Sequence, residues 1–175
     1  MGVGLFGGAF DPPHNGHLAL LEGAAAVGLD RLVILVSEAP GHKPVYAPAE
    51  ARVRLAEAAF PGYEIELDPY ERTIDMLRAR EWKDPVLLIG SDQLAAFASW
   101  KEPDAVLELA RLGVATRAGY PPPAVTRPER VELFDIAPVD VSSTEVRRRV
   151  ASGEPIADLV PLAVAAVISD LGLYT

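Results

Sequence analysis

The sequence predicts an α/β fold, a doubly wound parallel sheet in a single domain over residues 1–175. Three observations lead to this prediction. Short apolar runs alternate with helix-like stretches, which is the pattern of parallel strands joined by crossover helices. The runs at 32–36 and 86–89 are continuous rather than alternating, as in strands covered on both faces. A length of 175 residues, 50% of them hydrophobic, suits one full-sized core.

The elements follow one another along the chain. We expect strands at 3–6, 31–36, 64–67, 86–89, 112–116 and 131–136. We expect helices at 17–27, 49–60, 73–80, 104–110, 143–151 and 162–171. The last two form a C-terminal helical segment, whose apolar stretch is far shorter than the roughly 20 residues of a membrane span. In such folds ligands bind at the carboxyl ends of the strands, so the residues just after each strand are the candidates for a site.

The composition excludes several classes of protein. The chain has 16 Lys and Arg against 25 Asp and Glu, a net charge of −9, which disfavours general binding to nucleic acid or anionic membranes. It has no cysteine, which excludes disulfides, thiolate nucleophiles and thiolate metal sites. The first residues lack the pattern of a secretory signal, so we expect a cytoplasmic protein. The sequence is compatible with a monomer and with a homo-oligomer.

A glycine turn follows the first strand and leads into a helix, with the sequence Gly7-Gly8-Ala9-Phe10-Asp11-Pro12-Pro13-His14-Asn15-Gly16-His17. Glycines let a backbone approach a phosphate closely. The spacing is neither the dinucleotide fingerprint nor a P-loop. His14 and His17 share a face at a helix N-terminus, where N–H groups and the helix dipole favour an anion. Zinc would need three or four ligands, for which the sequence offers no obvious partners, so we expect a phosphate site and no metal ligands.

A second polar run follows the last strand and opens a helix: Asp140-Val141-Ser142-Ser143-Thr144-Glu145-Val146-Arg147. Its structural explanation is that Ser142 and Glu145 form a capping box and that Glu145 pairs with Arg149 at i,i+4. Its functional explanation is that three hydroxyls at a helix start, with Arg147 on the same face, form a second anion site. Two facing helix N-termini suit a polyphosphate.

Two shorter segments also follow strands. Gly90-Ser91-Asp92 is either a helix cap or part of a site, and Phe97 with Trp100 is either core or a stacking surface for a flat ring. The pair His42-Lys43 either supplies a cation to the site or is solvated.

These motifs resemble those of the nucleotidylyltransferases with a His-x-Gly-His signature, and within them the bacterial nicotinate-nucleotide adenylyltransferases. The similarity covers nearly the whole chain, including the closing stretch from Leu159-Val160-Pro161 to Leu173-Tyr174. It implies a Rossmann-like sheet of the nucleotidylyltransferase type. It also implies transfer of AMP from ATP to nicotinate mononucleotide in NAD biosynthesis, with Mg²⁺ bound through the ATP phosphates.

The resemblance further implies roles for individual residues. The catalytic residues would be His14, His17 and Arg147. ATP would be bound by Gly7, Gly8, Ala9, Phe10, His14, His17, Gly90, Asp92, Ser142, Ser143, Thr144 and Arg147. The acceptor would be bound by Lys43, Arg72, Thr73, Phe97 and Trp100, with Trp100 stacking on the nicotinate ring.

The sequence departs from the family pattern at three places. Ala9 stands where the family often has Ser or Thr, Arg72 stands where Tyr is expected, and Gly41 replaces a proline before His42-Lys43. The motifs therefore predict the binding of ATP more specifically than the identity of the acceptor. Alternatives are another phosphate acceptor, such as nicotinamide mononucleotide or phosphopantetheine, and a non-catalytic nucleotide-binding module. The phosphopantetheine enzymes typically show Thr-x-Gly-His, and the acidic charge disfavours a tRNA-synthetase-like fragment.

Overall fold

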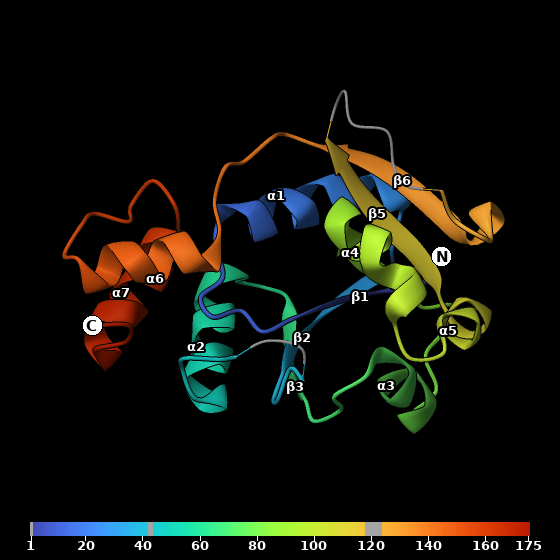
Figure 1. The fold of residues 1–175 in the computed structure, drawn as a ribbon, viewed down its shortest axis with the longest axis horizontal. Coiled ribbons are helices and arrows are strands. Elements are labelled where there is room, and N and C mark those ends of the chain that lie inside the picture. Colours follow the sequence, from blue (N-terminus) through green and yellow to red (C-terminus); the bar gives the residue numbers. More distant parts are fainter. Residues whose placement is uncertain (1, 42–43, 118–123) are drawn as a thin grey trace.

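The computed structural model describes residues 2–41, 44–117 and 124–175. Within these ranges six strands form one parallel sheet in the order β3-β2-β1-β4-β5-β6 (Figure 1). The strands are β1 (Val3–Gly8), β2 (Arg31–Ser37), β3 (Glu64–Asp68), β4 (Val86–Gly90), β5 (Arg111–Arg117) and β6 (Val131–Ile136). The predicted doubly wound Rossmann-like sheet is confirmed, and its strand order reverses between β1 and β4.

Helices connect the strands, and most have the predicted positions. They are α1 (Asn15–Ala24), α2 (Ala49–Ala59), α3 (Thr73–Ala79), α4 (Ser91–Ala96), α5 (Pro103–Leu109), α6 (Ser143–Ala151) and α7 (Leu162–Leu171), with short 3-10 turns η1 (Ala25–Val27), η2 (Phe97–Ser99) and η3 (Pro128–Arg130). Three details differ from the prediction. The first helix ends at Ala24 rather than Val27, because its last three predicted residues form the 3-10 turn η1. The first helix begins at Asn15 rather than His17, because His14 is its N-cap. The short helix α4 was not predicted, because its six residues look like a turn in the sequence.

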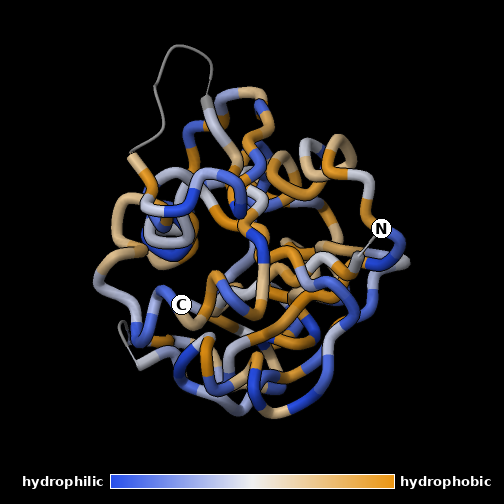
Figure 2. The backbone as a smooth tube through the Cα atoms, turned by 90° about the vertical axis from the view of Figure 1, so that its right-hand side faces the viewer, coloured by the Kyte–Doolittle hydropathy of each residue, from blue (hydrophilic) through white to orange (hydrophobic). Residues whose placement is uncertain are grey.

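Two apolar layers cover the sheet. On one face Phe6, Ile34 and Leu88 pack with residues of α1, α2, α6 and α7. On the other face Leu5 and Leu87 pack with residues of α3, α4 and α5. Neighbouring residues of a strand point to opposite faces, so the continuous apolar runs at 32–36 and 86–89 feed both layers. Figure 2 shows the hydrophobic stretches running mostly through the middle of the molecule.

The C-terminal helical segment is also confirmed. Helices α6 and α7 lie with the C-terminus at the opposite end of the molecule from α5 (Figure 1). Helix α7 packs on α2 and buries Val164 and Ile168, as predicted for the apolar stretch near the end of the chain. None of the helices in the described parts of the chain has the length and hydrophobicity needed to cross a membrane.

The strand order reverses between the central strands β1 and β4, and these two strands separate at their carboxyl ends. The register of β1 with β4 covers only Gly4–Val86 and Leu5–Leu87. Beyond these pairs the carboxyl ends of the two strands separate, which is where ligands bind in open α/β sheets. The glycines at the ends of β1 and β4 lie at this edge.

Candidate active site

The turn between β1 and α1 brings two imidazole rings together. His14 and His17 stack with their ring centroids 3.8 Å apart. A Cβ at Gly16 would lie 3.1 Å from the His14 ring, so glycine leaves room for this stack. The backbone N–H of His14 donates to Nδ1 of His17 at 3.1 Å. Because Nδ1 accepts, the neutral His17 ring carries its proton on Nε2, the nitrogen that can donate to an anion.

The glycines at the ends of β1 and β4 differ in what a side chain at their positions would meet. A Cβ at Gly8 would lie 3.0 Å from the ring of Phe10, which is 2% exposed and packs edge-on against His17. Phe10 has a φ of 49°, a left-handed conformation that is costly for a residue with a side chain. A Cβ at Gly7 or Gly90 would meet no atom within 4 Å in the described parts of the chain. The ends of β1 and β4 therefore present bare backbone to open space.

Side chains of α6 join this turn from the other end of the sequence. Nη1 of Arg147 donates to the carbonyl of Asp11 at 2.7 Å, and Oγ of Ser143 donates to the carbonyl of Pro12 at 2.8 Å. Nη2 of Arg147 donates to Oγ1 of Thr144 at 3.2 Å. The guanidinium also lies over the ring of Tyr46, 4.1 Å from its centroid. The amino ends of α1 and α6 are therefore neighbours.

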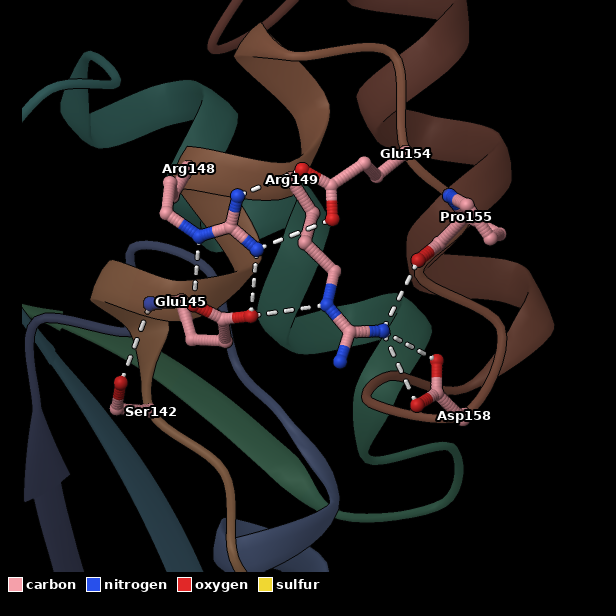
Figure 3. A network of polar contacts seen from close by, with 7 residues as sticks. All are labelled: Ser142, Glu145, Arg148, Arg149, Glu154, Pro155 and Asp158. Carbon is pink, nitrogen blue, oxygen red and sulfur yellow. Dashed lines mark hydrogen bonds and ion pairs between the residues drawn. The ribbon is translucent and has the colours of Figure 1, made fainter.

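Ser142 caps α6, but the predicted capping box forms only in part. Oγ of Ser142 accepts from the backbone N–H of Glu145 at 3.1 Å. The Glu145 carboxylate turns instead to Arg148 and Arg149, at 2.9 Å from each (Figure 3). Charge-assisted bonds are stronger than a bond to a neutral N–H, which explains the choice. The two arginines lower the pKa of Glu145 to about 2, and the predicted pair with Arg149 is confirmed.

Arg149 extends this network to the loop before α7. Its Nη1 donates to the Asp158 carboxylate at 3.0 Å and to the Pro155 carbonyl at 3.2 Å (Figure 3). The carbonyl of Asp158 accepts from Nδ2 of Asn15 at 3.0 Å. The carbonyl of Leu159 accepts from the backbone N–H of Asn15 at 2.9 Å. Helix α6 and the first residue of α1 are thus held by the same loop.

Two buried charged residues, which the sequence analysis did not single out, support the turn. Asp11 is 4% exposed, and its carboxylate accepts from the backbone N–H groups of Tyr46 at 2.6 Å and Ala47 at 3.1 Å. It also accepts from the hydroxyl of Tyr174 at 2.7 Å. Arg52 is 1% exposed; burial lowers its pKa, and the charge of Asp11 opposes this shift.

Arg52 binds the loops after two strands. Its guanidinium donates to the carbonyls of Ala9, Ser37 and Glu38 at 2.6 to 2.9 Å and to that of Ala47 at 3.0 Å. A signal for this role was present in the sequence. Arg52 lies on the buried face of α2, with the buried residues Leu55, Ala56 and Ala59 following it at helical spacing. A charge in a core-facing position indicates a paired, structural role.

The third predicted segment lies after β4. Oγ of Ser91 donates to the carbonyl of Ala115 on the neighbouring strand at 2.8 Å, and Asp92 is exposed on α4. Phe97 is 7% exposed and belongs to the core layer with α3 and α5. Trp100 is half-buried, with its ring 5.1 Å from that of Phe97. Trp100 thus keeps one part of its ring accessible.

Ion pairs hold the Trp100 segment against α3. Lys101 pairs with Asp75 at 2.9 Å, and Arg78 pairs with Glu102 at 2.7 Å, all four side chains being 37–49% exposed. Thr73 is the first residue of α3. Arg72 precedes it and pairs at 2.7 Å with Glu71. Lys43, with His42, lies outside the described residues.

The contacts divide the predicted site residues into two groups. The first group, around the loop after β1, holds His14, His17, Phe10, Ser143, Thr144 and Arg147 together. The second group, Thr73 and Trp100, lies on the other layer of the sheet. Within residues 2–41, 44–117 and 124–175, no group of three or more His, Asp or Glu is placed to hold a metal ion.

The comparison with protein families decides where this arrangement belongs. The model of the cytidylyltransferase-like family matches residues 5–149, which include both helix starts. The chain belongs to the cytidylyltransferase-like family. Two relatives match this chain over nearly its whole length. A protein of Rubrobacter xylanophilus named probable nicotinate-nucleotide adenylyltransferase is 38% identical, over 99% of this chain and 92% of its own length. One of Thermus thermophilus with the same name is 37% identical, over 99% and 100%.

Solved structures support the family's fold. A Plasmodium falciparum nicotinic acid mononucleotide adenylyltransferase complexed with NaAD has a TM-score of 0.76 to this chain. It is 16% identical, over 98% of this chain and 96% of its own. A putative nicotinate-nucleotide adenylyltransferase of Vibrio parahaemolyticus has a TM-score of 0.68 at 19% identity, over 98% and 94%. At these identities the likeness concerns the fold.

Proposed function

We propose that this chain is an adenylyltransferase that moves AMP from ATP to nicotinate mononucleotide, forming nicotinate adenine dinucleotide and pyrophosphate. One observation carries the ATP half of the proposal. Arg147 and Ser143 of α6 bind the backbone of the turn that holds His14 and His17. The N-termini of α1 and α6, two imidazoles and a guanidinium therefore meet beside the carboxyl end of β1. Such an arrangement suits a triphosphate.

The chemistry requires no nucleophile from the protein. An oxygen of the nicotinate mononucleotide phosphate attacks the α-phosphorus of ATP, and the bond to the bridging oxygen breaks to release pyrophosphate. The attacking phosphate is largely dianionic near neutral pH, since its second pKa is about 6, so it needs no general base. Catalysis then consists of aligning two anions and stabilising the charge that develops on the leaving group.

The residues of the turn and α6 supply that stabilisation. His17 presents Nε2–H, because Nδ1 is occupied by the backbone N–H of His14. Arg147 presents the part of its guanidinium fork that is not bound to Asp11 and Thr144. Gly7 and Gly90 admit the nucleotide close to the backbone, because nothing in the described structure fills the space of their absent side chains. Asp92 on the exposed side of α4 is proposed for the adenosine.

The acceptor half rests on the relatives named nicotinate-nucleotide adenylyltransferase, at 35–38% identity over nearly the full chain. Trp100 is proposed to stack on the pyridine ring, since part of its ring is accessible. The first N–H groups of α3, at Thr73, are proposed for the nicotinate carboxylate. Arg72 is the N-cap residue of α3 and pairs with Glu71. The proposal includes a cytoplasmic location, which suits a reaction of free nucleotides.

We propose that Mg²⁺ enters the site with ATP. The described residues contain no cluster of His, Asp or Glu that would form a dedicated metal site. Mg²⁺ keeps several waters and binds through substrate phosphates, so such a cluster is not needed. When bound, Mg²⁺ neutralises part of the phosphate charge. The protein's own contribution is to orient the triphosphate by His17, Arg147 and the helix N-termini.

The test is pyrophosphate release from ATP and Mg²⁺ across a panel of acceptors. The panel contains nicotinate mononucleotide, nicotinamide mononucleotide and phosphopantetheine. We expect rapid release with nicotinate mononucleotide and formation of the dinucleotide. Release only with another acceptor would show that nicotinate mononucleotide is not the substrate. ATP binding without release under any condition would indicate a non-catalytic nucleotide-binding module.

A further inference from the structure

The second-to-last residue of the chain reaches the centre of the candidate site. Helix α7 ends at Leu171, and Gly172 and Tyr174 both have left-handed backbone, with φ of 59° and 64°. The backbone N–H of Leu173 turns back to the carbonyl of Ile168 at 3.0 Å. This reversal directs the Tyr174 hydroxyl to Oδ1 of Asp11, 163 residues away in sequence, at 2.7 Å.

Asp11 connects this hydroxyl to Arg147. Its carboxylate accepts three hydrogen bonds, of which that from Tyr174 comes from a side chain and those from Tyr46 and Ala47 come from the backbone. Its carbonyl accepts from Nη1 of Arg147 at 2.7 Å. The same residue therefore binds both the end of the chain and the guanidinium proposed for the triphosphate.

Asp11 also fixes the second contact of Arg147. The guanidinium lies over the ring of Tyr46, and the backbone N–H of Tyr46 donates to Oδ2 of Asp11 at 2.6 Å. Besides Oγ1 of Thr144, the guanidinium thus contacts a carbonyl and an aromatic ring whose positions both depend on Asp11. Burial and the bond to Asp11 raise the pKa of Tyr174, so its hydroxyl stays a donor over the whole neutral range.

We propose that Tyr174 is a positioning residue, which holds Arg147 in place for the triphosphate through Asp11. This inference rests on the proposed function of the site. A tyrosine that only anchored α7 would stabilise the fold without affecting nucleotide binding. A tyrosine that positions Arg147 has an effect that exists only while Arg147 is present.

A double-mutant cycle with ATP binding as the readout separates these roles. The variants are Tyr174→Phe, Arg147→Ala and the double variant, with Tyr63→Phe as the matched control because Tyr63 is 43% exposed and lies just before β3, at the amino ends of the strands. The dissociation constant of ATP with Mg²⁺ is measured by calorimetry, and the midpoint of urea denaturation is measured for each variant. Calorimetry needs no acceptor, so the result does not depend on which acceptor the enzyme uses.

We expect Tyr174→Phe to weaken ATP binding about tenfold when Arg147 is present and less than about twofold in the Arg147→Ala background, as for coupled neighbours. Tyr63→Phe should leave ATP binding unchanged. An equal loss in both backgrounds, or a lower denaturation midpoint with unchanged ATP binding, would overturn the proposal. If Tyr174→Phe does not fold, Asp11→Asn replaces it in the same cycle with the same expected coupling to Arg147. A failure of the acceptor panel above would reject the transfer reaction while leaving this cycle interpretable.

Discussion

The loop after β1 is held by buried groups, whereas the segment around Trp100 is held by exposed ones. Asp11 and Arg52 are 4% and 1% exposed and bind backbone atoms of the surrounding loops. Lys101 and Asp75, which hold the Trp100 segment to α3, are 48% and 37% exposed and bind each other's side chains. Buried charge-assisted bonds resist salt and fix one geometry, while exposed ion pairs contribute little and are screened.

This difference has a consequence for function. The buried side surrounds the residues proposed for the triphosphate, which every enzyme with this chemistry must hold in one arrangement. The exposed side surrounds the residues proposed for the acceptor, and it includes Arg72, one of the departures from the family pattern. We infer that acceptor affinity can change by small surface substitutions, while the triphosphate side tolerates few.

The largest expected effect is from Arg52→Leu. Removing this guanidinium leaves four carbonyls without this donor and removes the buried positive charge that Asp11 stabilises. We expect the free energy of unfolding to fall by about 3–5 kcal/mol, measured by urea denaturation. Arg54→Leu is the matched control, because Arg54 is exposed on the same helix, and it should change stability by less than about 0.5 kcal/mol. Equal effects of the two substitutions would remove the contrast between the two sides.

The next effect concerns chemistry on the buried side. His17→Ala removes the Nε2–H donor and should lower kcat about a hundredfold, on the order of 3 kcal/mol, as for loss of one preorganised donor. Steady-state pyrophosphate release measures it, with circular dichroism to check the fold. Tight zinc binding by the unmodified protein that is abolished in His17→Ala would show instead that His17 is a metal ligand.

On the exposed side the expected effects are smaller and confined to the acceptor. Trp100→Ala removes the accessible ring and should raise KM for nicotinate mononucleotide about tenfold, from loss of stacking, with KM for ATP nearly unchanged. The two KM values are measured in one series of initial rates. An unchanged acceptor KM would place Trp100 among the core residues that pack with Phe97.

The smallest effect sharpens the comparison by its salt dependence. Lys101→Ala breaks the pair with Asp75 and should raise the acceptor KM about twofold at low salt, since exposed pairs contribute about 0.2–1 kcal/mol. At about 0.5 M salt the variant and the unmodified protein should have the same KM, because the pair is then screened. Lys83→Ala, at an exposed position before β4, is the control. A difference that persists at high salt would show that Lys101 contacts the acceptor directly.

The sequence predicts the architecture well because the strands bury apolar runs on both faces. It places each strand and five of the longer helices within about two residues, and α1 within three. It misses α4 because Gly90-Ser91-Asp92 has the composition of a turn, and it places the start of α1 late because histidine is an unusual N-cap. Both errors are local.

The sequence predicts the candidate site less completely than the fold. The residues His14, His17 and Arg147 are visible because each belongs to a motif that opens a helix after a strand. The bonds that connect them are not visible, because Asp11 binds Tyr174 across 163 positions and Arg147 across 136. Such long-range pairs depend on how α6 and α7 pack, which no local pattern encodes.

The most direct test of the shared phosphate site compares two neighbouring arginines of α6. Arg147 binds the turn after β1, whereas Arg148 binds the carboxylates of Glu145 and Glu154 on the surface of its own helix and the loop after it. The measurement is kcat/KM for ATP in pyrophosphate release with nicotinate mononucleotide as acceptor. We expect Arg147→Ala to lower it about a hundredfold with the denaturation midpoint nearly unchanged, and Arg148→Ala to leave it within about twofold. Equal values for the two variants would contradict the claim that the starts of α1 and α6 form one triphosphate site.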